Sequence, residues 1–154
     1  MDVKSYERGK VIFRQGDPGD CMYEIQGGSV GVYTDFGGPN EKKIAHLAAP
    51  DFLGEMGLLD NAPRSATAVA MEDNTLLEVI SEADFNAYFF ENPSKVLMLM
   101  EQLCFRLRNT TREYLDACRT VYETAEAEKA DKPKSGFLRS SIRKFSDYYR
   151  DTRS

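Results

Sequence analysis

The sequence predicts a mainly β fold with C-terminal helices: an antiparallel β-barrel or double-stranded β-helix (jelly roll), followed by a short helix and a long one. Two observations lead to this prediction. Residues 3–80 hold six to eight short β-prone runs that alternate with turn-forming residues, as is typical of such barrels. From Ser81 the apolar residues change to helical spacing, and no Gly or Pro follows Pro93 until about Ala130.

The expected strands are separated by strong turn signals. A dense turn cluster at 15–20 follows the first short run, and the pair Gly27–Gly28 lies between two further β-prone runs. Because a tight primed turn needs positive φ, the glycine pair predicts a hairpin between those two runs. The sequence predicts strands at 11–13, 21–26, 29–34, 42–47, 66–70 and 75–80.

A short helix over 81–92 and a long helix over 93–130 are expected after the strands. Ser81 and Asp84 resemble a capping box with Asp in place of Glu, and Pro93 suits the first position of the long helix. The long helix carries an apolar seam at Val96, Met100, Leu103, Leu107, Tyr114 and Val121. Such a seam either packs on the β domain or pairs two chains, and a helix of about 35 residues outruns a domain this small.

The composition excludes several classes of protein. A net charge of −5 argues against a protein that wraps nucleic acid, and three distant cysteines form neither a disulfide framework nor a metal-binding pair. The N-terminus has no apolar run typical of a secretory signal, and no stretch reaches the roughly 18 apolar residues of a membrane span. We therefore expect a reduced, cytoplasmic protein without a membrane span.

Residues 131–154 are expected to form a basic C-terminal tail with a short helix. The tail holds seven Lys or Arg residues against three Asp, while the rest of the chain is acidic. A break at 132–136 separates it from the long helix. The tail either contacts a partner or an acidic surface, or packs back on the acidic β domain.

The stretch GEMGLLDNAPRSAT, residues 54–67, carries the most distinctive chemistry. Gly54 allows a close backbone approach, and EMGLL is expected to form one helical turn whose free N–H groups favour an anion. Arg64 supplies a planar fork suited to phosphate, and Ser65 adds a hydroxyl. Glu55 can accept hydrogen bonds from sugar hydroxyls. A ligand with a phosphate and a ribose would use both charged residues; the alternative is a structural ion pair on a surface loop.

This stretch resembles the phosphate-binding cassette of the cyclic nucleotide-binding domain family. The matching residues are Phe52, Gly54, Glu55, Met56, Gly57, Leu58, Pro63, Arg64, Ser65, Ala66 and Thr67. Segments 8–13, 16–20 and 28–30 resemble other parts of the family pattern, so the likeness covers residues 3 to about 122. It implies a domain over 1–122, with a β-roll at 3–80, a hinge helix at 81–92 and the long helix at 93–130.

The resemblance implies a non-catalytic sensor that binds a cyclic mononucleotide and needs no cofactor. Glu55 would accept the ribose 2′-hydroxyl, and Arg64 would pair with the cyclic phosphate. The implied ligand-binding residues are Gly54, Glu55, Met56, Arg64, Ser65, Ala66, Thr110 and Thr111. Serine at position 65 and the two threonines on the long helix favour cAMP, with cGMP as the second candidate. The threonines can equally be ordinary residues of a helix surface.

The resemblance also implies a homodimer through the long helix and a movement of the hinge helix on binding. Only about 22 residues follow Lys132, too few for the helix-turn-helix domain of the family's transcription factors. No DNA-binding domain is therefore expected, and the downstream partner is not indicated.

Two other functions stay open at this point. A scaffold could keep the fold and mediate protein–protein contacts without binding nucleotide, although the retained Glu55 and Arg64 argue against it. A metal oxygenase on a similar barrel needs a cluster of imidazoles and carboxylates, and His46 is the single histidine of the chain. An enzyme is therefore not expected.

Overall fold

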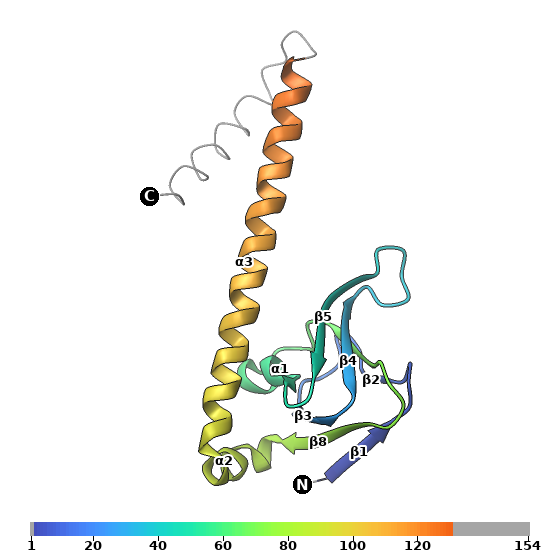
Figure 1. Cartoon of the computed structure of the whole chain (residues 1–154), viewed down its shortest axis with the longest axis vertical. Helices are drawn as coiled ribbons and strands as arrows, with labels where there is room; N and C mark the ends of the chain where they lie inside the picture. The colour runs from blue at the N-terminus through green and yellow to red at the C-terminus, as the bar shows by residue number, and fades with distance from the viewer. Residues whose placement is uncertain (1, 131–154) are drawn as a thin grey trace. The chain divides into compact units, whose positions relative to one another are not determined.

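The computed structural model describes residues 2–130, so the tail predicted for 131–154 lies outside the described residues. Figure 1 shows the order of the elements along the chain. They are β1 (Asp2–Tyr6), β2 (Val11–Phe13), β3 (Cys21–Gly27), β4 (Ser29–Thr34), β5 (Lys42–Ala48), β6 (Phe52–Leu53), α1 (Glu55–Asp60), β7 (Thr67–Ala70), β8 (Thr75–Ser81), α2 (Glu82–Glu91) and α3 (Pro93–Ala130). The chain divides into two compact units after Gln102, and α3 continues from the first unit into the second.

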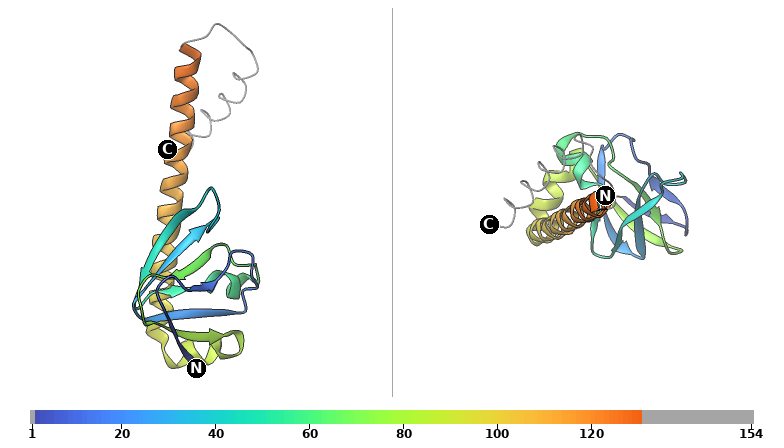
Figure 2. Two further views of the ribbon diagram at one scale, coloured as in Figure 1. Left: turned by 90° about the vertical axis from the view of Figure 1, so that its right-hand side faces the viewer. Right: turned by 90° about the horizontal axis from the view of Figure 1, so that it is seen from above.

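The described strands form two four-stranded sheets, which Figure 2 shows from two further sides. One sheet has the order β1-β8-β3-β6 and the other the order β2-β7-β4-β5, and the paired strands are antiparallel. The predicted mainly β fold with C-terminal helices is therefore confirmed, but these strands do not close into a barrel.

The hairpin predicted at Gly27–Gly28 is wrong. β3 pairs with β6 and β8, whereas β4 pairs with β5 and β7, so the strands that flank the glycines belong to different sheets. Gly28 does adopt a positive φ of 74°, and a Cβ there would lie 2.7 Å from Oγ1 of Thr75. Gly28 therefore forms a corner between the two sheets. Its positive φ indicates a change in chain direction, but it does not indicate which strands pair.

The core joins apolar side chains from both sheets. Ile25, Leu53 and Leu77 come from the first sheet and pack with Val30 and Ala68 of the second. All five are at most 2% exposed. Burial of this kind is the main stabilising contribution to a domain of this size, and it fixes β6 and β7, the strands that flank the segment 54–66.

Both predicted helix starts are confirmed. The Oγ of Ser81 accepts a hydrogen bond of 3.2 Å from the backbone N–H of Asp84 and donates one of 2.6 Å to its carboxylate. α2 ends at Glu91, and Pro93 is the first residue of α3. No helix among residues 2–130 is both long enough and apolar enough to cross a membrane.

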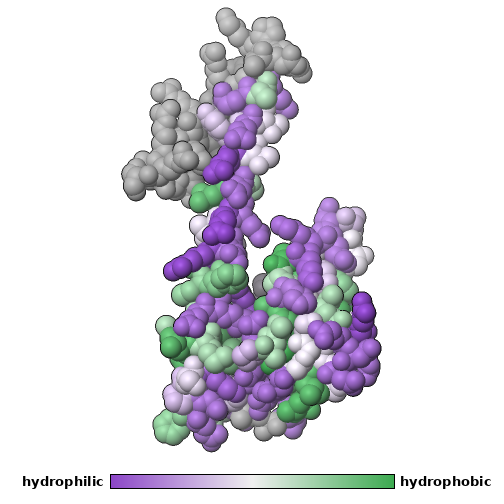
Figure 3. Space-filling model, in the orientation of Figure 1, coloured by the Kyte–Doolittle hydropathy of each residue, from purple (hydrophilic) through white to green (hydrophobic). Residues whose placement is uncertain are grey.

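The apolar seam of α3 is largely exposed. The exposed fractions are 57% for Met100, 68% for Leu107, 55% for Tyr114 and 58% for Val121. In Figure 3 apolar residues appear along the helix as green patches between purple polar ones. An exposed apolar seam of this length favours a partner over a solvated helix face.

A buried polar cluster connects β3 with α2 and the start of α3. Glu24, 3% exposed, accepts hydrogen bonds at Oε2 from Gln26 Nε2 at 2.8 Å, from Lys95 Nζ at 2.7 Å and from Tyr88 Oη. Lys95 Nζ also donates to Tyr88 Oη at 2.8 Å. The cluster therefore connects α2 and the first turn of α3 to β3 through one carboxylate oxygen.

This cluster predicts a decline of stability at alkaline pH. Burial raises the pKa of Tyr88 above its ordinary value of 10.0, and the hydrogen bond and negative charge of Glu24 raise it further. The contribution of Tyr88 is therefore complete below pH 10.0 and is lost as the pH rises above it, because the unfolded chain then releases a proton that the folded chain retains. In Tyr88→Phe, the free energy of unfolding should fall less between about pH 9 and about pH 11 than in the wild type. Urea denaturation at both pH values measures this slope.

The matched control is Tyr122→Phe, which alters a half-buried tyrosine of α3 that lies outside this cluster. It should retain the wild-type slope. Equal slopes for the wild type and Tyr88→Phe would show that Tyr88 does not retain its proton as described.

Candidate anion-binding site

The segment predicted as the cassette contains the short helix that was expected at its start. α1 begins at Glu55, directly after β6, and lies against β3 (Figure 1). Gly54 precedes it with a φ of 77°. Glu55 is 1% exposed and Arg64 is 4% exposed, so the alternative of an ion pair on a surface loop is wrong as to location: both charged residues are buried.

Neighbouring carbonyls and an aromatic ring hold the side chain of Arg64. Its Nη1 donates to the carbonyl of Gly54 at 2.7 Å, and its Nη2 donates to the carbonyl of Cys21 at 2.6 Å. The Cζ atom lies 4.4 Å from the centroid of the Phe13 ring. Nε is buried and has no hydrogen-bond partner among the described residues. The guanidinium is thus fixed in place with part of its hydrogen-bonding capacity unused.

The backbone of Arg64 is held by the turn that follows β2. Arg64 N–H donates to the carbonyl of Asp17 at 2.8 Å, and Gly16 N–H donates to the carbonyl of Arg64 at 2.9 Å. In the same turn, a Cβ on Gly19 would lie 2.6 Å from Cα of Gly57 in α1. The turn at 16–20 therefore supports the cassette from outside, which explains why glycines are needed at this contact.

The electrostatics of the site favour an anion. A buried cation needs a partner of opposite charge, and the carbonyls that Arg64 contacts are neutral. The nearby phenol of Tyr23 does not supply the charge: burial raises its pKa, and the hydrogen bond and charge of Cys21 add to this effect, although Arg64 lowers it. Tyr23 therefore stays neutral at physiological pH. A ligand with a negatively charged oxygen would complement the guanidinium.

The other predicted site residues lie in different surroundings. Met56 on α1 is 51% exposed, Ser65 is exposed, and Ala66 is buried. Thr110 and Thr111 are exposed residues of α3 in the second unit, so their contribution to the site stays a prediction. Among the residues 2–130, no three His, Cys, Asp or Glu side chains lie together as a metal ion would require.

Sequence reasoning missed the roles of Phe13 and Cys21 at this site.

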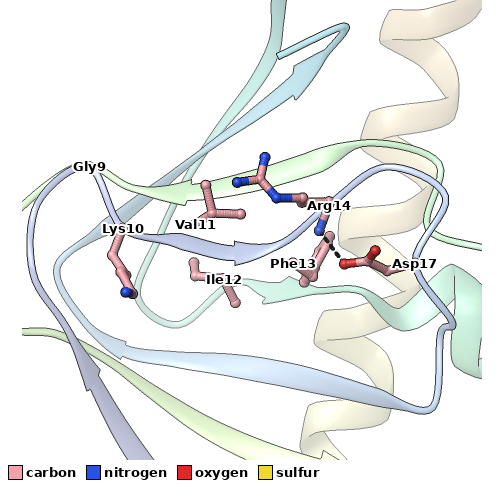
Figure 4. Close-up of a pocket in the computed structure, with 7 residues that line it drawn as sticks. All are labelled: Gly9, Lys10, Val11, Ile12, Phe13, Arg14 and Asp17. Carbon is pink, nitrogen blue, oxygen red and sulfur yellow. Dashed lines mark hydrogen bonds between the residues drawn. The ribbon is translucent and has the colours of Figure 1, made fainter. Parts of the chain in front are cut away.

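A cavity of about 470 Å³ is lined by residues 9–14 and Asp17 along β2 (Figure 4). Its lining includes Phe13 but not the cassette itself, so this cavity lies beside the buried arginine. In the sequence, segment 8–13 resembled the family pattern only as a strand. Nothing in its residue types indicated that Phe13 would contact Arg64, 51 positions further along the chain.

Gly54 should be the least replaceable glycine of the cassette. A Cβ there would lie 2.5 Å from Nη1 of Arg64, and its φ of 77° is strained for any other residue. Gly37 has a similar φ of 78°, but its Cβ would meet nothing within 4 Å. We expect Gly54→Ala to lower the free energy of unfolding by about 1–3 kcal/mol more than Gly37→Ala does. Urea denaturation of both variants measures the difference, and equal losses would mean that Arg64 moves aside at no cost.

Comparison with known proteins assigns a family to the part of the chain that contains segment 54–67. The family model described as "Cyclic nucleotide-binding domain" matches residues 3–92. The cyclic AMP receptor protein of Thermus thermophilus is 39% identical over 108 residues, which are 70% of this chain and 50% of that protein. The cAMP-dependent protein kinase regulatory subunit of Colletotrichum orbiculare is 34% identical over 73 residues, 47% of this chain and 18% of that protein.

Solved structures show the same relationship. The catabolite activator protein of Thermus thermophilus superposes with a TM-score of 0.64 and 38% identity, covering 80% of this chain and 56% of that one. The regulatory domain of Toxoplasma gondii PKA with cAMP gives a TM-score of 0.51 and 31% identity, covering 56% of this chain and 32% of that one. This chain thus spans about half, or less, of the length of these relatives. It belongs to the cyclic nucleotide-binding domain family.

Proposed function

We propose that this chain binds a cyclic mononucleotide, with cAMP preferred to cGMP, and acts as a non-catalytic regulatory module. The observation that carries the proposal is the buried guanidinium of Arg64, whose Nε has no partner among the described residues. An unsatisfied buried donor costs roughly 1–3 kcal/mol, so a native structure that retains one calls for an explanation. A cyclic phosphate would supply both the acceptor and the negative charge.

The cassette residues take the following roles in this proposal. Arg64 pairs with the cyclic phosphate, and Glu55 accepts the ribose 2′-hydroxyl. Gly54, Met56, Ser65 and Ala66 complete the site around the phosphate and ribose. Thr110 and Thr111 contact the base in this proposal. The functional domain would then cover residues 1–122 and extend beyond residues 3–92, which the family model matches.

The preference for cAMP draws on Ser65 and on the relatives. The Thermus thermophilus relative is a cyclic AMP receptor protein, and the Toxoplasma gondii structure holds cAMP. Ser65 is an exposed residue that directly follows the buried Arg64 in the sequence. In the proposed complex, the Ser65 hydroxyl would be a further donor to the ligand.

Calorimetric titration tests the function. The protein is unfolded, stripped of carried-over nucleotide, refolded, and titrated first with cAMP and then with cGMP. Micromolar or tighter binding of cAMP, with weaker binding of cGMP, is expected. Tighter cGMP binding would overturn the preference. No binding of either by folded protein would overturn the proposal and favour a scaffold that keeps the fold without the ligand.

We further propose that the chain forms a homodimer through the seam of α3. Leu107 is 68% exposed, and its seam neighbours Met100 and Tyr114 are more than half exposed. Leu107→Gln should shift the protein toward monomer, because burying one leucine contributes about 1.5–3 kcal/mol and each dimer would bury two. The dissociation constant should rise about 100-fold or more.

Size-exclusion chromatography with light scattering over a dilution series measures this change. Arg108→Gln introduces the same residue at the adjacent exposed position and should leave the dimer intact. A wild-type monomer at high concentration would contradict the proposed dimer.

A further inference from the structure

We propose that Phe13 is a positioning residue for Arg64, its ring fixing the guanidinium so that the unused N–H groups are available to an anionic ligand. The inference rests on the proposed function, because it concerns how the same arginine meets the cyclic phosphate. It assigns a binding role to β2, a strand outside the cassette.

The geometry fixes the guanidinium from two directions. The carbonyls of Gly54 and Cys21 accept from Nη1 and Nη2, at 2.7 and 2.6 Å. The ring of Phe13 lies 4.4 Å from Cζ, within the roughly 6 Å over which a cation is attracted to an aromatic face. Nη2 also contacts Cys21 Sγ at 3.5 Å, whereas Nε has no hydrogen-bond partner among the described residues.

The ring contributes something that an aliphatic side chain of similar size would not. A buried cation beside neutral carbonyls is poorly compensated before a ligand arrives. The negative face of the ring compensates part of the charge without using any N–H donor. Arg64 can therefore stay buried and oriented in the free protein, with its donors available to the ligand.

Phe13 is itself held rigidly enough to serve as a platform. It lies in β2, where it pairs with Ala68 of β7, and its ring stacks on Tyr23 with centroids 6.0 Å apart. A Cβ on Gly54 would approach both Phe13 Cε1, at 3.4 Å, and Arg64 Nη1, at 2.5 Å. The ring, the guanidinium and the residue before α1 thus share one closely packed space.

The test compares Phe13→Leu with Phe13→Tyr by calorimetric titration with cAMP. Phe13→Leu should weaken binding about tenfold, and Phe13→Tyr, which keeps the aromatic face, should stay within about threefold of the wild type. Phe36→Leu is the matched control, because Phe36 is also a half-buried ring beside a tyrosine, 5.2 Å from Tyr33. It should bind as the wild type does. Thermal denaturation establishes that each variant is folded.

A double-mutant cycle separates positioning from packing. In the Arg64→Gln background no cation faces the ring, so Phe13→Leu should cause little further loss of affinity. An equal loss in both backgrounds, or wild-type affinity in Phe13→Leu, would overturn the inference while leaving the proposed function intact. A wild-type protein that binds no cyclic nucleotide would instead overturn the proposed function, so the two failures are distinguishable.

Discussion

Replacing Arg64 with glutamine is expected to weaken cyclic nucleotide binding by about 10- to 100-fold, because a hydrogen bond to a charged group contributes roughly 1.5–3 kcal/mol. The loss should lie toward the upper end, since Arg64 is only 4% exposed and its interaction with a phosphate would be poorly screened by solvent. Glutamine keeps a planar donor but removes the charge. Calorimetric titration of the refolded, nucleotide-free variant measures the effect.

Arg14→Gln is the matched control for this prediction. Arg14 is exposed and lines the cavity along β2, where its backbone N–H donates to the Asp17 carboxylate at 2.8 Å (Figure 4). If the phosphate binds at the cassette, Arg14→Gln should retain wild-type affinity within about twofold. The opposite pattern, with affinity lost in Arg14→Gln and retained in Arg64→Gln, would move the anion site from the cassette to that cavity.

The local parts of this site could be predicted from the sequence because they depend on residues close along the chain. The glycine, glutamate and short apolar run at 54–58 specify one helical turn, and α1 begins at Glu55 as expected. Ser81 and Asp84 specify the start of α2 in the same way. In both cases the hydrogen-bonding groups lie within a few residues of each other, so the pattern of residue types is sufficient.

The remaining features could not be predicted because they depend on pairing across the sheets. The glycines at 27 and 28 indicate a turn, but whether it pairs β3 with β4 or sends the chain to the other sheet depends on the packing of Gly28 against Thr75. The ring of Phe13 reaches Arg64 only because β2 pairs with β7. Glu24 and Lys95 are 71 positions apart, with no periodicity that connects them.

Glu24 depends on Lys95 to balance its buried negative charge. Lys95→Met should lower the free energy of unfolding by about 2–3 kcal/mol, because it leaves the carboxylate of Glu24 buried without its cation. The value lies below the 3–5 kcal/mol typical of a fully buried pair, since the side chain of Lys95 is 24% exposed and that of Glu24 is 4% exposed. Urea denaturation gives the loss. Lys4→Met, on exposed β1, should change stability by less than about 0.5 kcal/mol.

A second substitution shows whether the unpaired charge causes the loss. Glu24→Gln in the Lys95→Met background removes the buried charge, so it should recover part of the lost stability even though the ion pair is then absent altogether. Further destabilisation would mean that Glu24 serves mainly as an acceptor for Tyr88 and Gln26 rather than as a partner of the lysine. Hydrogen exchange locates the effect: protection should fall in α2 and the first turn of α3, since Tyr88 and Lys95 join these elements to β3 through one oxygen. A loss confined to α2 and the first turn of α3 would show that these segments can loosen while the two sheets stay folded, which a regulatory movement of α2 would require.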